Sequence, residues 1–234
     1  MVSIVCCSMR QNFMENVFQN YERQAWKEKE LIIILNKDNM DITKWEERAK
    51  QSQGVSVYQL SEEVTLGECL NYGIEKAKYD FIAKFDDDDY YAPHYLAQSM
   101  EALEEMNADI VGKRTVYMYF ENLRTLAIHR PGNENMFVEG ELMGATLLFK
   151  KEISEQVRFR HKNKGEDSTF LRKCRTKGYR MYSTDKCHYA CLRASTPEHH
   201  TWRKGTKSLL KNSSIVCETD DYKSLVQCTS ADSE

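Results

Sequence analysis

The chain has 234 residues, a formal net charge of −3, 41% hydrophobic residues, three prolines and ten glycines. This composition argues against a fibrous or disordered chain and favours one globular domain over two small ones. The strongest apolar run, LIIIL at 31–35, is much shorter than the ~20 residues of a membrane span, so no transmembrane segment is expected. Because the start lacks the basic region of a signal peptide, we expect a cytoplasmic protein.

Four β-rich segments alternate with helical patterns over the first hundred residues. The second helical pattern can be capped by Asp41, and the third begins with Thr65 and Glu68, the signature of a capping box. Strands that alternate with helices predict an α/β fold, with a mostly parallel sheet flanked by helices, in which ligands bind at the carboxyl ends of the strands. The expected strands are 2–7, 30–36, 54–60 and 80–85.

The pattern changes after residue 108. Two β-rich runs, 109–120 and 123–129, predict a hairpin, and a further strand is expected within 144–151. A helix should begin near Glu166 and end before Gly178. From about 192 the sequence has little periodicity, which suggests a loop or lid. Residues 213–234 carry five acidic residues against one lysine and are expected to form a weakly ordered tail.

Eight cysteines are present, and none of them are spaced as C-x-x-C. In the absence of an export signal we expect free thiols rather than disulfides. Cys187 and Cys191 flank His188, but without a second pair of ligands a zinc site is not favoured.

Four aspartates in a row, 86–89, follow the fourth expected strand and precede a helix that Pro93 could open. Two like charges about 4 Å apart repel by about 1 kcal/mol even in bulk water. The run therefore needs solvent, protonation or a cation. A solvated turn is the ordinary interpretation of such a run, but its place between a buried strand and a helix favours a cation site.

Several segments together resemble family 2 glycosyltransferases, enzymes of the GT-A fold. The most specific are the Asp-x-Asp-Asp with a proline seven residues after its first aspartate, and the pair Glu166 and Asp167 about 80 residues later. The resemblance covers residues 2–203 and implies a single GT-A domain over 1–212. Residues 1–108 would form a Rossmann-like half that binds the nucleotide-sugar, and 109–212 an acceptor-binding half with a lid.

The resemblance implies transfer of a sugar from a nucleotide diphosphate donor, with inversion, assisted by Mn²⁺ or Mg²⁺. Such ions prefer oxygen ligands, and they stabilise the charge on a departing diphosphate. We assign Asp88 to the metal and Asp86 to the ribose or a metal-bound water. Asp87 belongs to the same donor-binding loop, although its side chain is expected to point away, and Asp89 should fix the loop. These assignments follow the match of residues 86–89 to the family motif.

Asp167 would be the general base that takes the proton from the acceptor hydroxyl. Partial burial beside Glu166 could bring its pKa closer to neutrality, which suits a base. The alternative is that both acids only favour the start of a helix.

The chain departs from the family pattern in its first and second loops. The first βα turn holds Cys7, Ser8 and Arg10, whose backbone groups would meet the nucleobase. After the second strand, Asn36 or Asp38 could hydrogen-bond a uracil or thymine edge, so that UDP is the first choice of donor and dTDP the second. Either residue can equally be an ordinary turn residue.

The third departure is near the C-terminal end, where a histidine of the family is replaced by Ser195. Arg193 could still contact the diphosphate, and His188, His199 or His200 could complete the metal site. A surface or packing role is the alternative for each histidine. Residues 202–204 suit a lid over the donor phosphates.

Three other functions compete with this interpretation. Nine Lys or Arg between 158 and 180 raise nucleic-acid binding, but no nucleic-acid motif accompanies them. A sugar nucleotidyltransferase is disfavoured because no Gly-rich phosphate loop opens the chain. A non-catalytic binding protein of the same fold remains an alternative. The expected partners are therefore a nucleotide-sugar donor and a carbohydrate or other hydroxyl acceptor, and an oligomer is compatible with the sequence.

Overall fold

A computed structural model describes residues 1–193 and 205–228. Its larger sheet has eight strands in the order β3-β2-β1-β4-β10-β6-β11-β9. Strands β1 to β4 are mutually parallel, β10 runs antiparallel between β4 and β6, and β6 pairs in parallel with β11. The strands span Val2–Ser8 (β1), Lys29–Leu35 (β2), Val55–Gln59 (β3), Phe81–Asp86 (β4), Ile110–Gly112 (β6), Met136–Val138 (β9), Leu148–Lys150 (β10) and Met181–Ser183 (β11).

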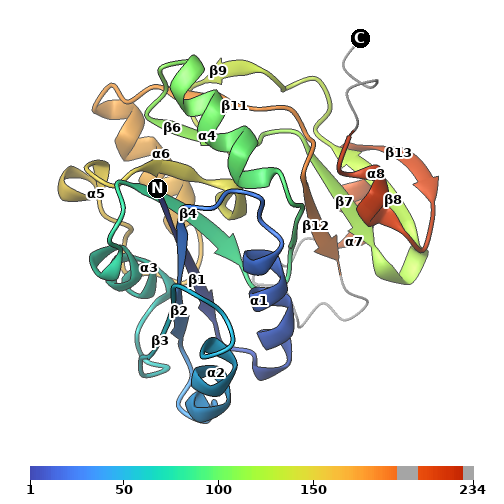
Figure 1. Cartoon of the computed structure of the whole chain (residues 1–234). Helices are drawn as coiled ribbons and strands as arrows, with labels where there is room; N and C mark the ends of the chain where they lie inside the picture. Colours follow the sequence, from blue (N-terminus) through green and yellow to red (C-terminus); the bar gives the residue numbers. More distant parts are fainter. Residues whose placement is uncertain (194–204, 229–234) are drawn as a thin grey trace.

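A second sheet of five strands lies beside the first, in the order β13-β8-β7-β12-β5 (Figure 1). Here β7 and β8 form the predicted hairpin, and β12 pairs in parallel with β7. The predicted run 109–120 divides, so that β6 joins the first sheet and β7 the second. The strands span Tyr90–Tyr91 (β5), Val116–Phe120 (β7), Thr125–His129 (β8), Tyr189–Arg193 (β12) and Ser213–Glu218 (β13).

Helices cover both faces of the first sheet, because alternate side chains of its buried strands point to opposite sides. Ile4 of β1 packs in one cluster with Phe18 and Trp45 of α1 and α2, whereas Val5 packs in another with Leu70 of α3. Among the described residues no helix is long and apolar enough to cross a membrane. The α-helices span Met14–Glu22 (α1), Ile42–Ala49 (α2), Leu66–Lys76 (α3), Tyr95–Glu105 (α4), Ile153–Gln156 (α5), Glu166–Thr176 (α6), Thr206–Leu210 (α7) and Tyr222–Leu225 (α8).

Most of the predicted helix starts and ends are confirmed. The Asp41 side chain accepts the Lys44 amide, and Thr65 forms the capping box with Glu68. Helix α6 ends just before Gly178, whose φ of +83° suits the left-handed turn after a helix. Pro93 lies two residues before α4 rather than in its first turn, because α4 begins at Tyr95.

Two expectations about the C-terminal part are wrong. The segment from 213 is not a weakly ordered tail as far as residue 228, because β13 pairs with β8 along the edge of the second sheet and α8 follows. Cys187 and Cys228 form a disulfide, whereas six other cysteines are free as predicted. The disulfide joins the segment just after α8 to the segment just before β12. Residues 229–234 lie outside the described part of the chain.

Candidate active site

The aspartate run lies at the junction of the two sheets. Asp86 ends β4 in the first sheet, and Tyr90 begins β5 in the second. Cys7 at the carboxyl end of β1 is the register partner of Asp86. The acids therefore stand at the carboxyl ends of parallel strands, the edge where open α/β sheets bind ligands.

Asp87 is buried and faces the first βα turn, and its carboxylate is not part of the cluster formed by Asp86, Asp88 and Asp89. It accepts a hydrogen bond of 2.5 Å from the Ser8 hydroxyl and forms an ion pair with Arg10. Burial and the neighbouring Asp88 raise the pKa of Asp87 to about 6, although Arg10 opposes this shift. Ser8 and Arg10, two of the predicted donor-binding residues, thus anchor the aspartate loop to the first βα turn.

Asp89 ties the same loop to the second sheet. Its buried carboxylate accepts hydrogen bonds from the Tyr189 hydroxyl (2.5 Å) and the Leu192 amide (3.1 Å). Its backbone carbonyl accepts from the side-chain amides of Asn16 and Asn20 of α1. Burial raises the pKa of Asp89, and Asp88 and Asp86 add to the shift. The loop is therefore anchored to α1 and to β12, as its expected fixing role requires.

Carboxylate oxygens of Asp86, Asp88 and Asp89 all lie within 4.8 Å of one another. Three oxygens at this spacing form a donor set that suits Mg²⁺ or Mn²⁺. Two cations already offset part of the charge, because Lys84 Nζ lies 2.5 Å from Asp86 and Arg10 Nη2 lies 3.1 Å from Asp88. The acids thus fit a divalent cation.

Asp167 lies in the first turn of α6, partly exposed, and its Oδ1 accepts the Ser168 amide at 2.6 Å. Glu166 beside it is buried, and burial together with Asp167 raises its pKa. A side chain on Gly144 would overlap Asp167, because an added Cβ would lie 1.8 Å from Oδ2. The turn at Gly144 is therefore shaped around the carboxylate.

Lys84 connects the aspartate run with α6. It is buried in β4, and although burial opposes its charge, Asp86 and Asp167 raise its pKa above the ordinary value. Its backbone amide donates to Leu147, just after the turn that contains Gly144. The buried ammonium group thus pairs with Asp86 and also interacts electrostatically with Asp167. A charged residue within the apolar run DFIAKF was the signal that could have marked it.

In the loop after β2, the side chains of Asn36 and Asp38 form hydrogen bonds with the loop after β3. The Asn36 side chain donates to the Ser61 carbonyl (2.8 Å), and the Asp38 carboxylate accepts the Glu62 amide (3.1 Å). These contacts are those expected of ordinary turn residues, and they link the loop after β2 to the loop after β3. Cys7 is half-buried, and burial raises the pKa of its thiol, which disfavours a thiolate ligand.

The structure does not bring His188 to the carboxylates. Among the described residues the cluster of potential metal ligands consists of the three aspartates alone. The His188 ring lies 5.9 Å from that of His94, and burial, with Lys113 nearby, lowers its pKa to about 4. Arg193 is buried at the end of β12. Residues 194–204, which include Ser195, His199, His200 and the proposed lid at 202–204, lie outside the described part of the chain.

A family model described as glycosyl transferase family 2 matches residues 3–186. The chain belongs to this family. Its fold is similar to that of S. aureus TarS residues 1–349 in complex with UDP-GlcNAc, with a TM-score of 0.69 and 15% identity over 88% of this chain and 61% of that one. It is also similar to the mannosyltransferase PcManGT from Pyrobaculum calidifontis in complex with GDP-Man and Mn²⁺, with a TM-score of 0.63 and 16% identity over 83% and 57%. No curated protein matches in sequence.

These likenesses establish the predicted GT-A fold for this member of family 2. The chain spans about three fifths of the length of either structure.

Proposed function

We propose that this family 2 member is a metal-dependent, inverting glycosyltransferase that moves a sugar from a nucleotide diphosphate donor to an acceptor hydroxyl. The observation that carries the proposal is the cluster of Asp86, Asp88 and Asp89 oxygens within 4.8 Å at the carboxyl end of β4. Asp88 would hold Mg²⁺ or Mn²⁺, with Asp86 on the ribose or a metal-bound water, and the ion would stabilise negative charge on the departing diphosphate. A cytoplasmic location stays part of the proposal and can be tested by cell fractionation.

In the proposed reaction the acceptor oxygen attacks the anomeric carbon while Asp167 takes the hydroxyl proton. The bond from that carbon to the diphosphate oxygen breaks, and its electron pair leaves with the nucleoside diphosphate. Attack from the face opposite the leaving group inverts the configuration. The fixed carboxylate of Asp167, packed against Gly144, supports this role because a base must be held within hydrogen-bonding reach of the proton it takes.

UDP is our first choice of donor nucleotide and dTDP the second. The similar structures are complexes of TarS with UDP-GlcNAc and of PcManGT with GDP-Man, so GDP belongs in the same test. Backbone groups of Cys7 and Ser8 would meet the base, and Arg193 the diphosphate. Asn36 and Asp38 could contribute to base recognition only if their contacts with Ser61 and Glu62 rearrange or are shared.

A thermal-shift experiment tests the donor site. Wild type is heated with UDP, dTDP, GDP or CMP, each with and without Mn²⁺ or Mg²⁺, and a ligand at ~100 times its Kd should stabilise the fold by about 2.7 kcal/mol. Asp88→Ala should abolish the metal-dependent shift. Asp80→Ala, which removes an exposed carboxylate just before the amino end of β4, is the matched control and should retain it. A nucleotide shift that needs neither metal nor Asp88 would refute the proposed donor site.

Asp167→Asn separates the enzyme from a non-catalytic binding protein of the same fold. If Asp167 is the base, this variant should lose turnover by a factor of about 10²–10⁴ while nucleotide affinity is kept. Transfer of a nucleotidyl group instead of a sugar, seen as pyrophosphate release from a nucleoside triphosphate, would favour the sugar nucleotidyltransferase.

A further inference from the structure

A pocket of about 590 Å³ lies outside the aspartate run, at the edge of the second sheet. Its walls come from the segment after β6, the loop after β8, the loop before Gly144 and the junction of α7 with β13. We name it the basic pocket, and its charged or polar walls include Arg114, Arg130, Asn133, Glu141, Lys211 and Ser213. Its volume is that of an ordinary small-molecule site.

Positive charge dominates the basic pocket. Arg114 pairs with Glu141 at 2.5 Å, and its buried Nε atom has no hydrogen-bond partner among the described residues. Within the same described ranges, no ion pair engages the side chains of Arg130 and Lys211. Three cations against one carboxylate leave an excess of two positive charges. A doubly charged oxyanion matches this excess and can accept hydrogen bonds from guanidinium groups.

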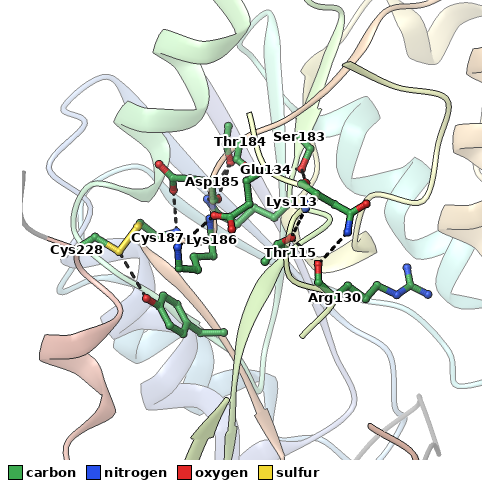
Figure 2. Close-up of polar contacts among 12 residues, drawn as sticks. Lys113, Thr115, Arg130, Glu134, Ser183, Thr184, Asp185, Lys186, Cys187 and Cys228 are labelled. Atoms are coloured by element: carbon green, nitrogen blue, oxygen red, sulfur yellow. Dashed lines mark hydrogen bonds and ion pairs between the residues drawn. A yellow bond between two sulfur atoms is a disulfide. The ribbon is translucent and has the colours of Figure 1, made fainter. Parts of the chain in front are cut away.

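The backbone of Arg130 is held firmly at the mouth of the pocket. Its carbonyl accepts the Thr115 hydroxyl (2.6 Å) and the Asn133 side-chain amide (3.0 Å), and its own amide donates to Asn212 (2.9 Å). Its φ of 52° lies in the left-handed region that non-glycine residues rarely adopt. Figure 2 shows the guanidinium of Arg130 extending away from the hydrogen-bonded cluster around Lys113 and Ser183. The loop is therefore a fixed support for a projecting cation.

The basic pocket is close to the proposed base. Glu141 is in its wall, and three residues later Gly144 packs against Asp167. Three residues of extended chain span at most about 11 Å. The connection between them is held in place, because the Met143 amide donates to the Lys113 carbonyl at 2.8 Å. A ligand in the pocket could thus extend a hydroxyl group toward Asp167.

We propose that the basic pocket binds a phosphate group of the acceptor, so that the substrate class is a phosphorylated hydroxyl compound. This inference rests on the proposed function for its acceptor role. The phosphate-binding role of the pocket stands on its own charges and geometry. Phosphate fits better than a carboxylate because its two negative charges equal the excess of the pocket.

Phosphate binding is tested by NMR on the ¹⁵N-labelled chain, which needs no turnover. UDP and Mg²⁺ are added first to occupy the donor site, and then glucose 6-phosphate, glucose or glucuronate is titrated. Glucose 6-phosphate should shift the backbone amides of 130, 133 and 212–214 in a saturable way. Glucose should leave them unchanged, and glucuronate should bind more weakly. No saturable shift of these amides, or equal binding of glucose or glucuronate, would overturn the proposal.

Charge variants give effects of opposite sign. Arg130→Gln and Lys211→Gln should each weaken glucose 6-phosphate binding by about fivefold, the contribution of one exposed charge at close range. Glu141→Gln should strengthen binding, because it removes the carboxylate. Lys207→Gln is the matched control, since this exposed lysine of α7 is not in the pocket wall and should have no effect. Equal affinities across all four variants would overturn the proposal.

Turnover then tests the acceptor role separately. Hydroxyl compounds are screened as pairs that differ only by a phosphate, and nucleoside diphosphate release is measured. Phosphorylated members should be preferred, and Arg130→Gln should raise their KM while the donor KM is unchanged. A preference for neutral members, or a raised donor KM, would overturn the acceptor role. If the thermal-shift test finds no donor site, the proposed function fails, whereas the NMR titration still decides phosphate binding.

Discussion

Gly144→Ala should move the proposed general base without removing it. Gly144 is buried in a tight turn beside α6, and a Cβ placed there would lie 1.8 Å from Oδ2 of Asp167 and 2.7 Å from its Cγ. Ordinary contact begins at 3.4 Å, so the carboxylate would have to move by about 1.6 Å. Rotation of the Asp167 side chain is the simplest response, because this residue is only partly buried.

A misplacement of about 1 Å in a reacting group can reduce the rate by ~10²-fold, and a general base contributes about 10²–10⁴-fold in total. We therefore expect kcat for nucleoside diphosphate release to fall by about 10²–10³-fold in Gly144→Ala. Nucleotide affinity, read from the thermal shift with metal, should stay close to wild type, because the alanine does not touch the aspartate run. Release can be followed with water or an added hydroxyl compound as acceptor.

Two comparisons make this result specific. Gly205→Ala adds the same methyl group where nothing lies within 4 Å and φ is −67°, so turnover should be unaffected. In the double variant Gly144→Ala with Asp167→Asn, the loss should be no greater than with Asp167→Asn alone, because both changes act on one carboxylate. Wild-type turnover in Gly144→Ala, or additive losses in the double variant, would refute the assignment of Asp167.

Three further predictions concern buried or half-buried groups. Lys84→Met should lower the free energy of unfolding by about 3 kcal/mol in urea denaturation, because it leaves the carboxylates near Lys84 uncompensated, and an unchanged midpoint would contradict this. Cys228→Ser should lower stability by about 4 kcal/mol, the chain-entropy value for a disulfide across 41 residues, and a reducing agent should abolish the difference from wild type. Burial lowers the pKa of His188 from 6.5 to about 4, so the unfolded chain binds a proton at a higher pH than the folded protein does. The free energy of unfolding of the wild type should therefore fall by at most about 3 kcal/mol as the pH is lowered from 6.5 to 4. Asparagine tolerates the φ of 68°, so His188→Asn should remove this pH-dependent loss of stability in thermal melts. The same pH dependence in the variant and the wild type would contradict the prediction.

The first half of the fold could be predicted because its signals are local. Buried strands and amphipathic helices alternate within short windows, and the capping box of Thr65 and Glu68 lies within four residues. The edge of the second sheet could not be predicted in the same way. Strand β13 pairs with β8, 84 to 93 positions earlier, and its acidic surroundings suggested a solvated tail. The disulfide of Cys187 and Cys228 likewise depends on this distant docking.

In the candidate site, too, the features that depend on local sequence could be predicted and those that depend on distant contacts could not. The aspartate run and Asp167 could be singled out because residue type and spacing mark them. Their electrostatic environment could not, since it depends on contacts between distant segments. Arg10 meets Asp87 across 77 residues, and Lys84 of β4 faces acids of α6.

These contacts change how the aspartate run is understood. A cation is one source of positive charge for it, but Arg10 and Lys84 already supply two charges from the protein itself. Asp87 and Asp89 are buried with raised pKa values, so protonation can relieve part of the repulsion as well. The chain can therefore hold four neighbouring aspartates before any metal binds. A bound cation would then compete with Arg10 for Asp88, whereas the ion pair of Arg10 with Asp87 would remain.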